Sequence, residues 1–142
     1  MPAQFWSMRP VQLAAPTFAR SRAFLAMAEA SPDLIAVLDA AGRRLYANTA
    51  LRRLLPAAVA LTGSDSFAHI HPDDRSAVRK LFMRVLSDRQ GREACYRIVD
   101  RFGRLRHLES RFFLVRDEAT GSLRLMAVSR ERLDNDDRLL AA

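Results

Sequence analysis

The apolar residues of this chain fall into short runs that predict strands near both ends of a domain, with helices between them. Residues 34–38 form a five-residue apolar run, and residues 43–47 follow it after a short turn, which predicts a β-hairpin. Residues 94–99, 104–115 and 122–129 are also β in character and are separated by short turns, which predicts an antiparallel meander. The order predicts an α+β protein in which helices cover one face of a single five-stranded antiparallel sheet.

Three helices are predicted around these strands. Residues 17–30 predict an amphipathic N-terminal helix that Thr17 caps and that ends before Pro32. Asn48 is expected to cap a short helix after the hairpin. Pro72 opens the clearest helix, because proline suits the first helical turn, and one apolar stripe follows it at spacings of three and four. The stripe consists of Val78, Leu81, Phe82, Val85 and Leu86.

The pattern divides the chain into four parts. Residues 1–16 contain three prolines and no consistent period, and they are expected to be a flexible arm. Residues 17–30 are the flanking helix, and residues 31–132 are the folded domain. Residues 133–142 are interpreted as a tail or as the start of a signalling helix.

Composition narrows the class of protein. The chain has 142 residues, 49% of them apolar and 27% charged, which is typical of one folded domain. The only cysteine is Cys95, so no intrachain disulfide can form, and a cytoplasmic location is expected. No run approaches the roughly 18 consecutive apolar residues of a membrane span, so no span is expected.

The formal net charge of +7 raises nucleic-acid binding as a hypothesis. The basic residues, all arginine except Lys80, are scattered along the chain, and we rank this hypothesis below the others.

Several short motifs, in order, resemble the PAS domain family. The hairpin with Asp39, Gly42, Tyr46 and Asn48 is similar to the opening of PAS domains. The element 71–75, His-Pro-Asp-Asp-Arg, resembles the one that opens the long PAS helix. The turn ending in Phe102-Gly103, with Arg106 and Glu109 after it, and Val115-Arg116-Asp117 before Thr120-Gly121 resemble the turns between the last strands of that family.

The resemblance implies a sensory or regulatory module in signal transduction. Such a module senses a small ligand or relays a conformational change to a protein partner or fused output domain, for example a histidine kinase, a cyclic-dinucleotide enzyme or a transcription regulator. It also implies a homodimer. The alternative is a ligand-free interaction module with a packed core. We expect no enzymatic activity, because the sequence has no phosphate-binding glycine loop and no nucleophile elbow.

Five polar residues are the candidates for lining a ligand pocket. A histidine facing the pocket is the usual axial ligand of a haem, and the cofactor is open between none, haem and flavin. No metal site is expected, because the histidines lack nearby partners at ligand spacing. The candidates are Asn48, His69, Arg97, His107 and Glu109.

The predicted N-terminal helix carries the candidates for dimerisation or signal transfer. They are its apolar residues Phe18, Phe24, Leu25 and Met27.

Overall fold

A computed structural model describes residues 17–18, 22–57 and 62–132. The expected arm, residues 1–16, and the expected tail, residues 133–142, lie outside the described residues, as does the side chain of Phe18.

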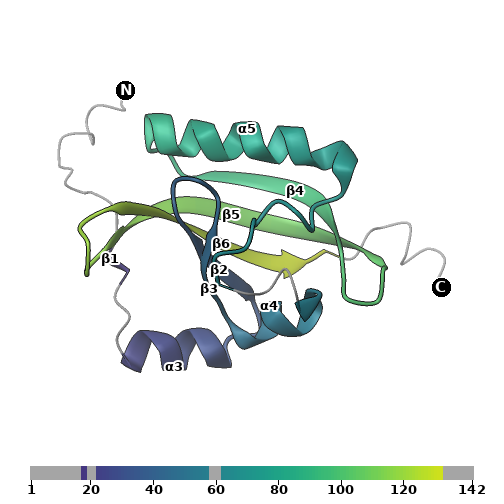
Figure 1. The fold of residues 1–142 in the computed structure, drawn as a ribbon, viewed down its shortest axis with the longest axis horizontal. Helices are drawn as coiled ribbons and strands as arrows, with labels where there is room; N and C mark the ends of the chain where they lie inside the picture. The colour runs from purple at the N-terminus through teal and green to yellow at the C-terminus, as the bar shows by residue number, and fades with distance from the viewer. Residues whose placement is uncertain (1–16, 19–21, 58–61, 133–142) are drawn as a thin grey trace.

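Five strands form the antiparallel sheet that the hydrophobic pattern predicts (Figure 1). Their order across the sheet is β4-β5-β6-β2-β3, so the first hairpin joins the edge of the later meander through the β2–β6 pair. The strands are β2 (Leu34–Leu38), β3 (Arg44–Ala47), β4 (Arg92–Val99), β5 (Leu105–Asp117) and β6 (Leu123–Glu131).

The expected helical start at Thr17 is wrong. Thr17 and Phe18 form a short strand, β1 (Thr17–Phe18), that pairs in parallel with the end of β5. The neighbouring strand β4 pairs with β5 only as far as Phe112, so the last residues of β5 have an open edge there. Residues with high strand propensity occupy that edge. The flanking helix α3 (Arg22–Ala30) begins five residues later than predicted.

The other two helices begin where the sequence predicts. Asn48 caps α4 (Thr49–Leu54), with its side chain accepting a hydrogen bond from the Leu51 amide. His71 caps α5 (Pro72–Asp88), and its Nδ1 accepts a hydrogen bond from the Asp73 amide at 3.0 Å. The long helix therefore starts at Pro72, as the sequence predicts.

Helices pack on both faces of the sheet, because side chains alternate along each strand. Helices α4 and α5 share the main core with one face, as predicted, through residues such as Leu51 and Phe82. Helix α3 packs on the other face, where Phe24 joins a smaller cluster around Val37 and Val115. Figure 1 shows α5 along β4 and β5, with α3 well separated from it.

Aspartates fix the ends of the hairpins. Asp39 and Asp100 each accept hydrogen bonds from the amides two and four residues later, at 2.8–2.9 Å. Asp117 accepts one from the Ala119 amide at 2.9 Å. A carboxylate that closes its own turn sets the register of the strands on either side.

Candidate functional site

A cavity of about 50 Å³ lies inside the main core, between the sheet and the helices α4 and α5. Most of its wall is apolar and comes from both the sheet and the helices. The apolar lining is Leu34, Ala36, Leu38, Leu51, Phe67, Ile70, Val78, Phe82, Leu108, Phe112, Leu125 and Ala127.

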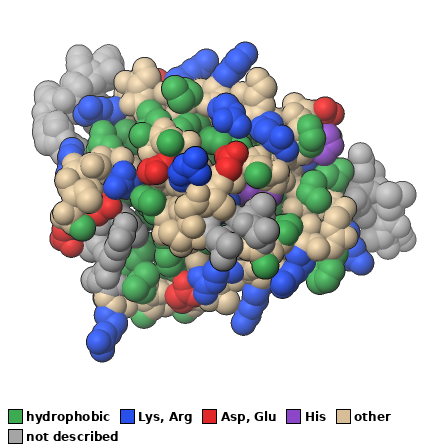
Figure 2. Space-filling view, viewed as in Figure 1, with side chains coloured by type: hydrophobic (Ala, Val, Ile, Leu, Met, Phe, Trp, Pro, Cys, Tyr) green, Lys and Arg blue, Asp and Glu red, His purple; other side chains and the backbone are tan. Residues whose placement is uncertain are grey.

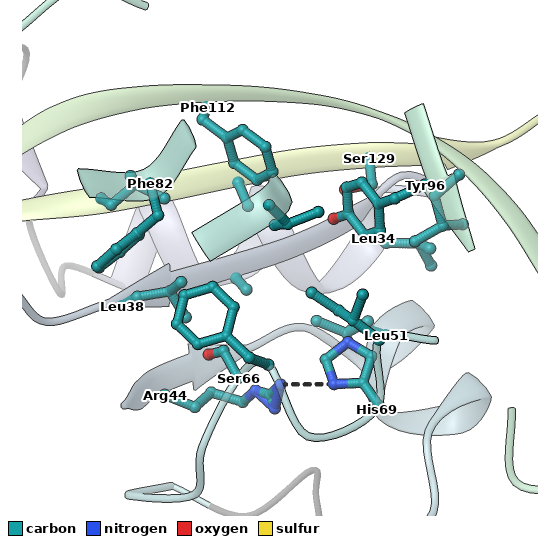
Figure 3. Close-up of a pocket in the computed structure, with 17 residues that line it drawn as sticks. Leu34, Leu38, Arg44, Leu51, Ser66, His69, Phe82, Tyr96, Phe112 and Ser129 are labelled. Carbon is teal, nitrogen blue, oxygen red and sulfur yellow. Dashed lines mark hydrogen bonds between the residues drawn. The ribbon is translucent and has the colours of Figure 1, made fainter. Parts of the chain in front are cut away.

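A first polar wall consists of Arg44, Ser66 and His69 (Figure 3). Nη2 of Arg44 lies 3.5 Å from Nδ1 of His69. Arg44 is only 1% exposed, which is rare for an arginine outside a functional or paired site. The Oγ of Ser66 is buried and has no hydrogen-bond partner among the described residues. A buried cation and an unused hydroxyl therefore face the same small space.

A β-bulge turns Arg44 into the core. Tyr46 pairs with Val37 and belongs to the smaller cluster on the face of the sheet that α3 covers. Arg44 pairs with Leu38 and lines the cavity on the opposite face. Residues two apart in a regular strand share a face, so Arg44 would otherwise point outward with Tyr46. The register shift between Val37 and Leu38 separates their directions.

Backbone hydrogen bonds hold the loop that supplies Ser66 and His69. The Ser66 amide donates to the Gly42 carbonyl at 3.0 Å, which ties this residue to the first hairpin. The His69 carbonyl accepts from the Val99 amide at 2.9 Å, which ties that residue to β4. The first polar wall thus combines two distant segments that the sheet brings together.

Burial decides the charges on this wall. Desolvation, followed by the nearby Arg44 guanidinium, lowers the pKa of His69 from 6.5 to about 3, so the imidazole is neutral at ordinary pH. Desolvation also lowers the pKa of Arg44, while the carboxylate of Asp65 opposes that shift. Arg44 remains a cation, since an arginine does not lose its proton in a protein.

The second polar wall is already hydrogen-bonded within itself. The Ser110 hydroxyl donates to the Tyr96 hydroxyl at 2.9 Å and lies 2.5 Å from the Ser129 hydroxyl. The Tyr96 ring stacks on Phe112, with ring centroids 6.1 Å apart. Burial raises the pKa of Tyr96, so this side of the cavity carries no charge.

The size of the cavity limits what it holds. A volume of about 50 Å³ corresponds to roughly three or four water molecules. Pockets for drug-sized ligands and large cofactors measure roughly 300 Å³ or more. A haem or a flavin does not fit unless the walls move. No group of three or more metal-ligating side chains is found within the described ranges.

Of the five predicted pocket residues, the structure places His69 on the cavity wall. Asn48 is not among the lining residues, which corrects that prediction. Its amide group donates to the Ala28 and Asp33 carbonyls at 2.8 and 2.9 Å, and its Oδ1 accepts from Ile35 and Leu51. All of its bonding capacity serves to join α3, β2 and α4.

Arg97, His107 and Glu109 do not line this cavity, whereas Glu109 lines a groove on the other face of the sheet. Arg97 forms a bidentate ion pair with Asp74 at the start of α5. His107 and Glu109 alternate on β5 with the cavity-lining Leu108 and so occupy the opposite face of the sheet.

No motif in the sequence identifies Arg44, Ser66 or Tyr96 as site residues. A regular alternation assigns Arg44 to the outer face, and a lone serine or tyrosine carries no motif. The single cysteine, Cys95, is exposed. It neighbours the inward-facing Tyr96, so its own side chain points outward.

The flanking helix is joined to the domain by a cluster around Glu29. Its carboxylate accepts hydrogen bonds from Tyr46 at 2.5 Å, from Thr49, and from Arg52 at 2.9 Å. These bonds, led by the one from Arg52, lower the pKa of Glu29 to about 2. The α3 face that carries Phe24 packs on the Tyr46 ring, with centroids 5.8 Å apart.

The dimer candidates on α3 have different environments. Phe24 and Leu25 are partly buried, whereas Met27 is 75% exposed. Met27 is therefore the candidate that remains available to a partner.

Many arginines serve the fold. They pair with carboxylates between neighbouring elements, and Figure 2 shows basic groups spread over one face and interrupted by other side chains. The ion pairs include Arg52–Glu29, Arg92–Asp88, Arg97–Asp74, Arg106–Asp100 and Arg124–Asp117.

Of the helices in the described residues, none is long and apolar enough to cross a membrane.

Comparison with known proteins identifies the class. The sequence model of the PAS fold family matches residues 28–136, and the chain therefore belongs to the PAS fold family. A search of curated proteins returned no significant match.

Solved PAS domains share the fold. The PAS domain of an HTR-like protein from Haloarcula marismortui is 23% identical, with a TM-score of 0.61 over 78% of this chain and 89% of that one. The PAS domain of the Cronobacter turicensis RpfR quorum-sensing receptor, in complex with BDSF, is 17% identical, with a TM-score of 0.59 over 72% and 96%. The N-terminal domain of a diguanylate cyclase with PAS/PAC sensor from Marinobacter aquaeolei is 18% identical, with a TM-score of 0.53 over 70% and 94%. These solved structures and this chain share the PAS fold.

Proposed function

We propose that this PAS domain senses a small ligand in its central cavity and passes the change to the flanking helix α3. The observation that carries the proposal is the buried cavity with the unpartnered Ser66 hydroxyl beside Arg44 on its wall. Buried polar groups are normally satisfied, so a ligand or water is the natural partner of that hydroxyl. The RpfR domain in complex with BDSF is a ligand-bound protein of the same fold, which is consistent with this role.

The relay runs through α4. Leu51 lines the cavity, and the next residue, Arg52, bonds to Glu29 on α3. Asn48, at the start of the same helix, donates to the Ala28 carbonyl on α3. A ligand that displaces Leu51 therefore moves both attachment points of α3. Occupancy shifts the population between two packings of α3 on the sheet.

The output of the module is a protein partner or a fused domain, and the module acts as a homodimer with Met27 of α3 at the contact. A diguanylate cyclase is one protein that carries such a domain at its N-terminus. The proposal assigns the chain no catalytic step and places it in the cytoplasm.

The test is mass spectrometry of small molecules released when the freshly purified chain is denatured. The matched variant is Ala127→Val, which adds two methyl groups at a cavity-lining position. The control is Val128→Ile on the same strand, at a residue that lines a groove on the outer face. We expect a released molecule from the wild type and from the control, and its loss from Ala127→Val. The same molecule released from all three proteins would place the binding elsewhere and contradict the proposal.

The small volume of the cavity favours a second candidate, a ligand-free interaction module. In that case the wild type releases nothing, and Ala127→Val raises the melting temperature because it fills an empty space. Loss of the dimer in a Met27→Glu variant then identifies α3 as the contact.

A further inference from the structure

We infer that the ligand of this cavity is a small monocarboxylate, with its carboxylate against Arg44 and Ser66 and its apolar part against the sheet and α5. The inference rests on the proposed function and names the class of ligand.

The charge of the cavity wall favours an anion. Of the described residues that line the cavity, Arg44 alone carries a formal charge, because His69 is neutral there. A desolvated guanidinium repels a cationic ligand and attracts an anionic one far more strongly than it would in water. Asp65 offsets part of this charge, but it is exposed and its Oδ1 already accepts from the Phe67 amide at 2.9 Å.

The hydrogen-bonding groups of the same wall match a carboxylate. The Ser66 side chain is 7% exposed and its hydroxyl has no partner among the described residues. A carboxylate has two acceptor oxygens, which match a hydroxyl donor and a guanidinium on one wall. A phosphate brings more oxygens and more charge than one arginine and one serine satisfy.

The rest of the cavity wall favours an apolar tail on the ligand. On the second polar wall, the hydroxyls of Tyr96, Ser110 and Ser129 hydrogen-bond to one another. The ligand therefore needs no polar group at that end. Phe82 and Phe112 also line the cavity and offer apolar surface. The ligand is therefore polar at one end only.

The volume of the cavity favours a short ligand. Room for roughly three or four water molecules suits an acid of acetate to butyrate length. A longer acid enters only if side chains such as Leu51 move, which is the movement that the relay requires.

The test is isothermal titration of the full chain with sodium butyrate and with butyramide, its neutral counterpart of similar shape. Arg44→Met keeps the apolar stem and removes the charge, and Ser66→Ala removes one donor. Ser76→Ala, an exposed serine on α5, is the matched control. Asp65→Asn keeps the acceptor for the Phe67 amide and removes the competing charge.

We expect butyrate to bind at least about tenfold more tightly than butyramide. Arg44→Met should weaken butyrate binding roughly 10- to 100-fold and Ser66→Ala by a smaller factor, since hydrogen bonds to charged groups are the strong ones. Asp65→Asn should tighten it, and Ser76→Ala should leave it unchanged. If Arg44→Met does not fold, the Ser66 and Asp65 variants and the two probes still decide the result.

Equal binding of butyramide and butyrate overturns the inference, and so does the absence of binding by every monocarboxylate from formate to hexanoate at millimolar concentration. Neither result removes the proposed function, because the released molecule and the Ala127→Val variant test that separately.

Discussion

Nη2 of Arg44 and Nδ1 of His69 lie 3.5 Å apart on one wall of the central cavity, although 25 residues separate them in the chain. Desolvation, followed by the charge of the Arg44 guanidinium, keeps the neighbouring imidazole neutral, and its Nδ1 can accept from the guanidinium. This relationship fixes both the charge of the wall and its dependence on pH.

The first prediction concerns acid stability. The folded-state pKa of His69, about 3, lies below its ordinary value of 6.5, so the unfolded chain binds the proton more tightly. Stability from this residue is present above pH 6.5 and declines as the pH falls toward 3. Between pH 7 and pH 5 we expect about 2 kcal/mol of loss from His69. Urea unfolding at the two pH values, compared with His69→Gln, measures it. An equal loss in wild type and variant would contradict the assignment.

A second prediction concerns Gly42, which has a φ of +84°. A Cβ at this position would lie 2.5 Å from the Phe67 ring, which lines the cavity and packs edge-on against Phe82. Gly42→Ala should cost about 2–4 kcal/mol, from the left-handed backbone and from the clash together.

The control for this variant is Gly103→Ala. Gly103 has a φ of +78° but no atom within 4 Å of an added Cβ, so only the backbone cost of about 1–2 kcal/mol applies. The difference between the two unfolding free energies isolates the contact with Phe67. Equal costs would mean that the ring moves away freely.

The third prediction concerns the attachment of α5 to β4. Asp74 accepts three hydrogen bonds from Arg97, through its amide, Nε and Nη2, at 2.8–2.9 Å. The side chain of Arg97 leads in lowering the pKa of Asp74 from 3.8 to about 2. Stability from this carboxylate is present above pH 3.8 and is lost as the pH falls through 2. Asp74→Asn should lower stability at neutral pH and flatten the dependence between pH 4 and 2.

Asp73→Asn is the matched control for that experiment. It removes a carboxylate that is 76% exposed in the same helical turn and leaves the bonds to Arg97 in place. Thermal melts of the three proteins across this range give the comparison. An Asp74→Asn profile that follows the wild type throughout would refute the role of the pair.

The fourth prediction tests the link between α3 and the domain. Glu29→Gln removes the charge that holds Arg52 and weakens the bonds from Tyr46 and Thr49. Amide hydrogen exchange in residues 22–30 should become faster, while exchange in β5 and β6 should not change. The control is Glu93→Gln, whose ion pair with Arg111 is about 70% exposed on both sides and contributes little. Unchanged exchange in α3 would show that Glu29 does not couple α3 to α4.

The sequence by itself determined the elements and their order, because those depend on local chemistry. Short apolar runs specify the strands, and the aspartate–glycine turns close the hairpins. Asn48 caps α4 as expected, and α5 begins at Pro72 as expected. The family resemblance rested on these same turn and cap residues, and the match to residues 28–136 confirms it.

The tertiary structure alone decided which residues face the cavity. A single register shift between Val37 and Leu38 directs Arg44 inward, and the local sequence contains no pattern that predicts this shift. Asn48 does not face the cavity, because its side chain forms hydrogen bonds with three separate segments. Helix α3 begins at Arg22 and not at Thr17, because Thr17 and Phe18 pair with the open edge at the end of β5. Each of these outcomes depends on contacts between distant parts of the chain, and those contacts exist only once the sheet has formed.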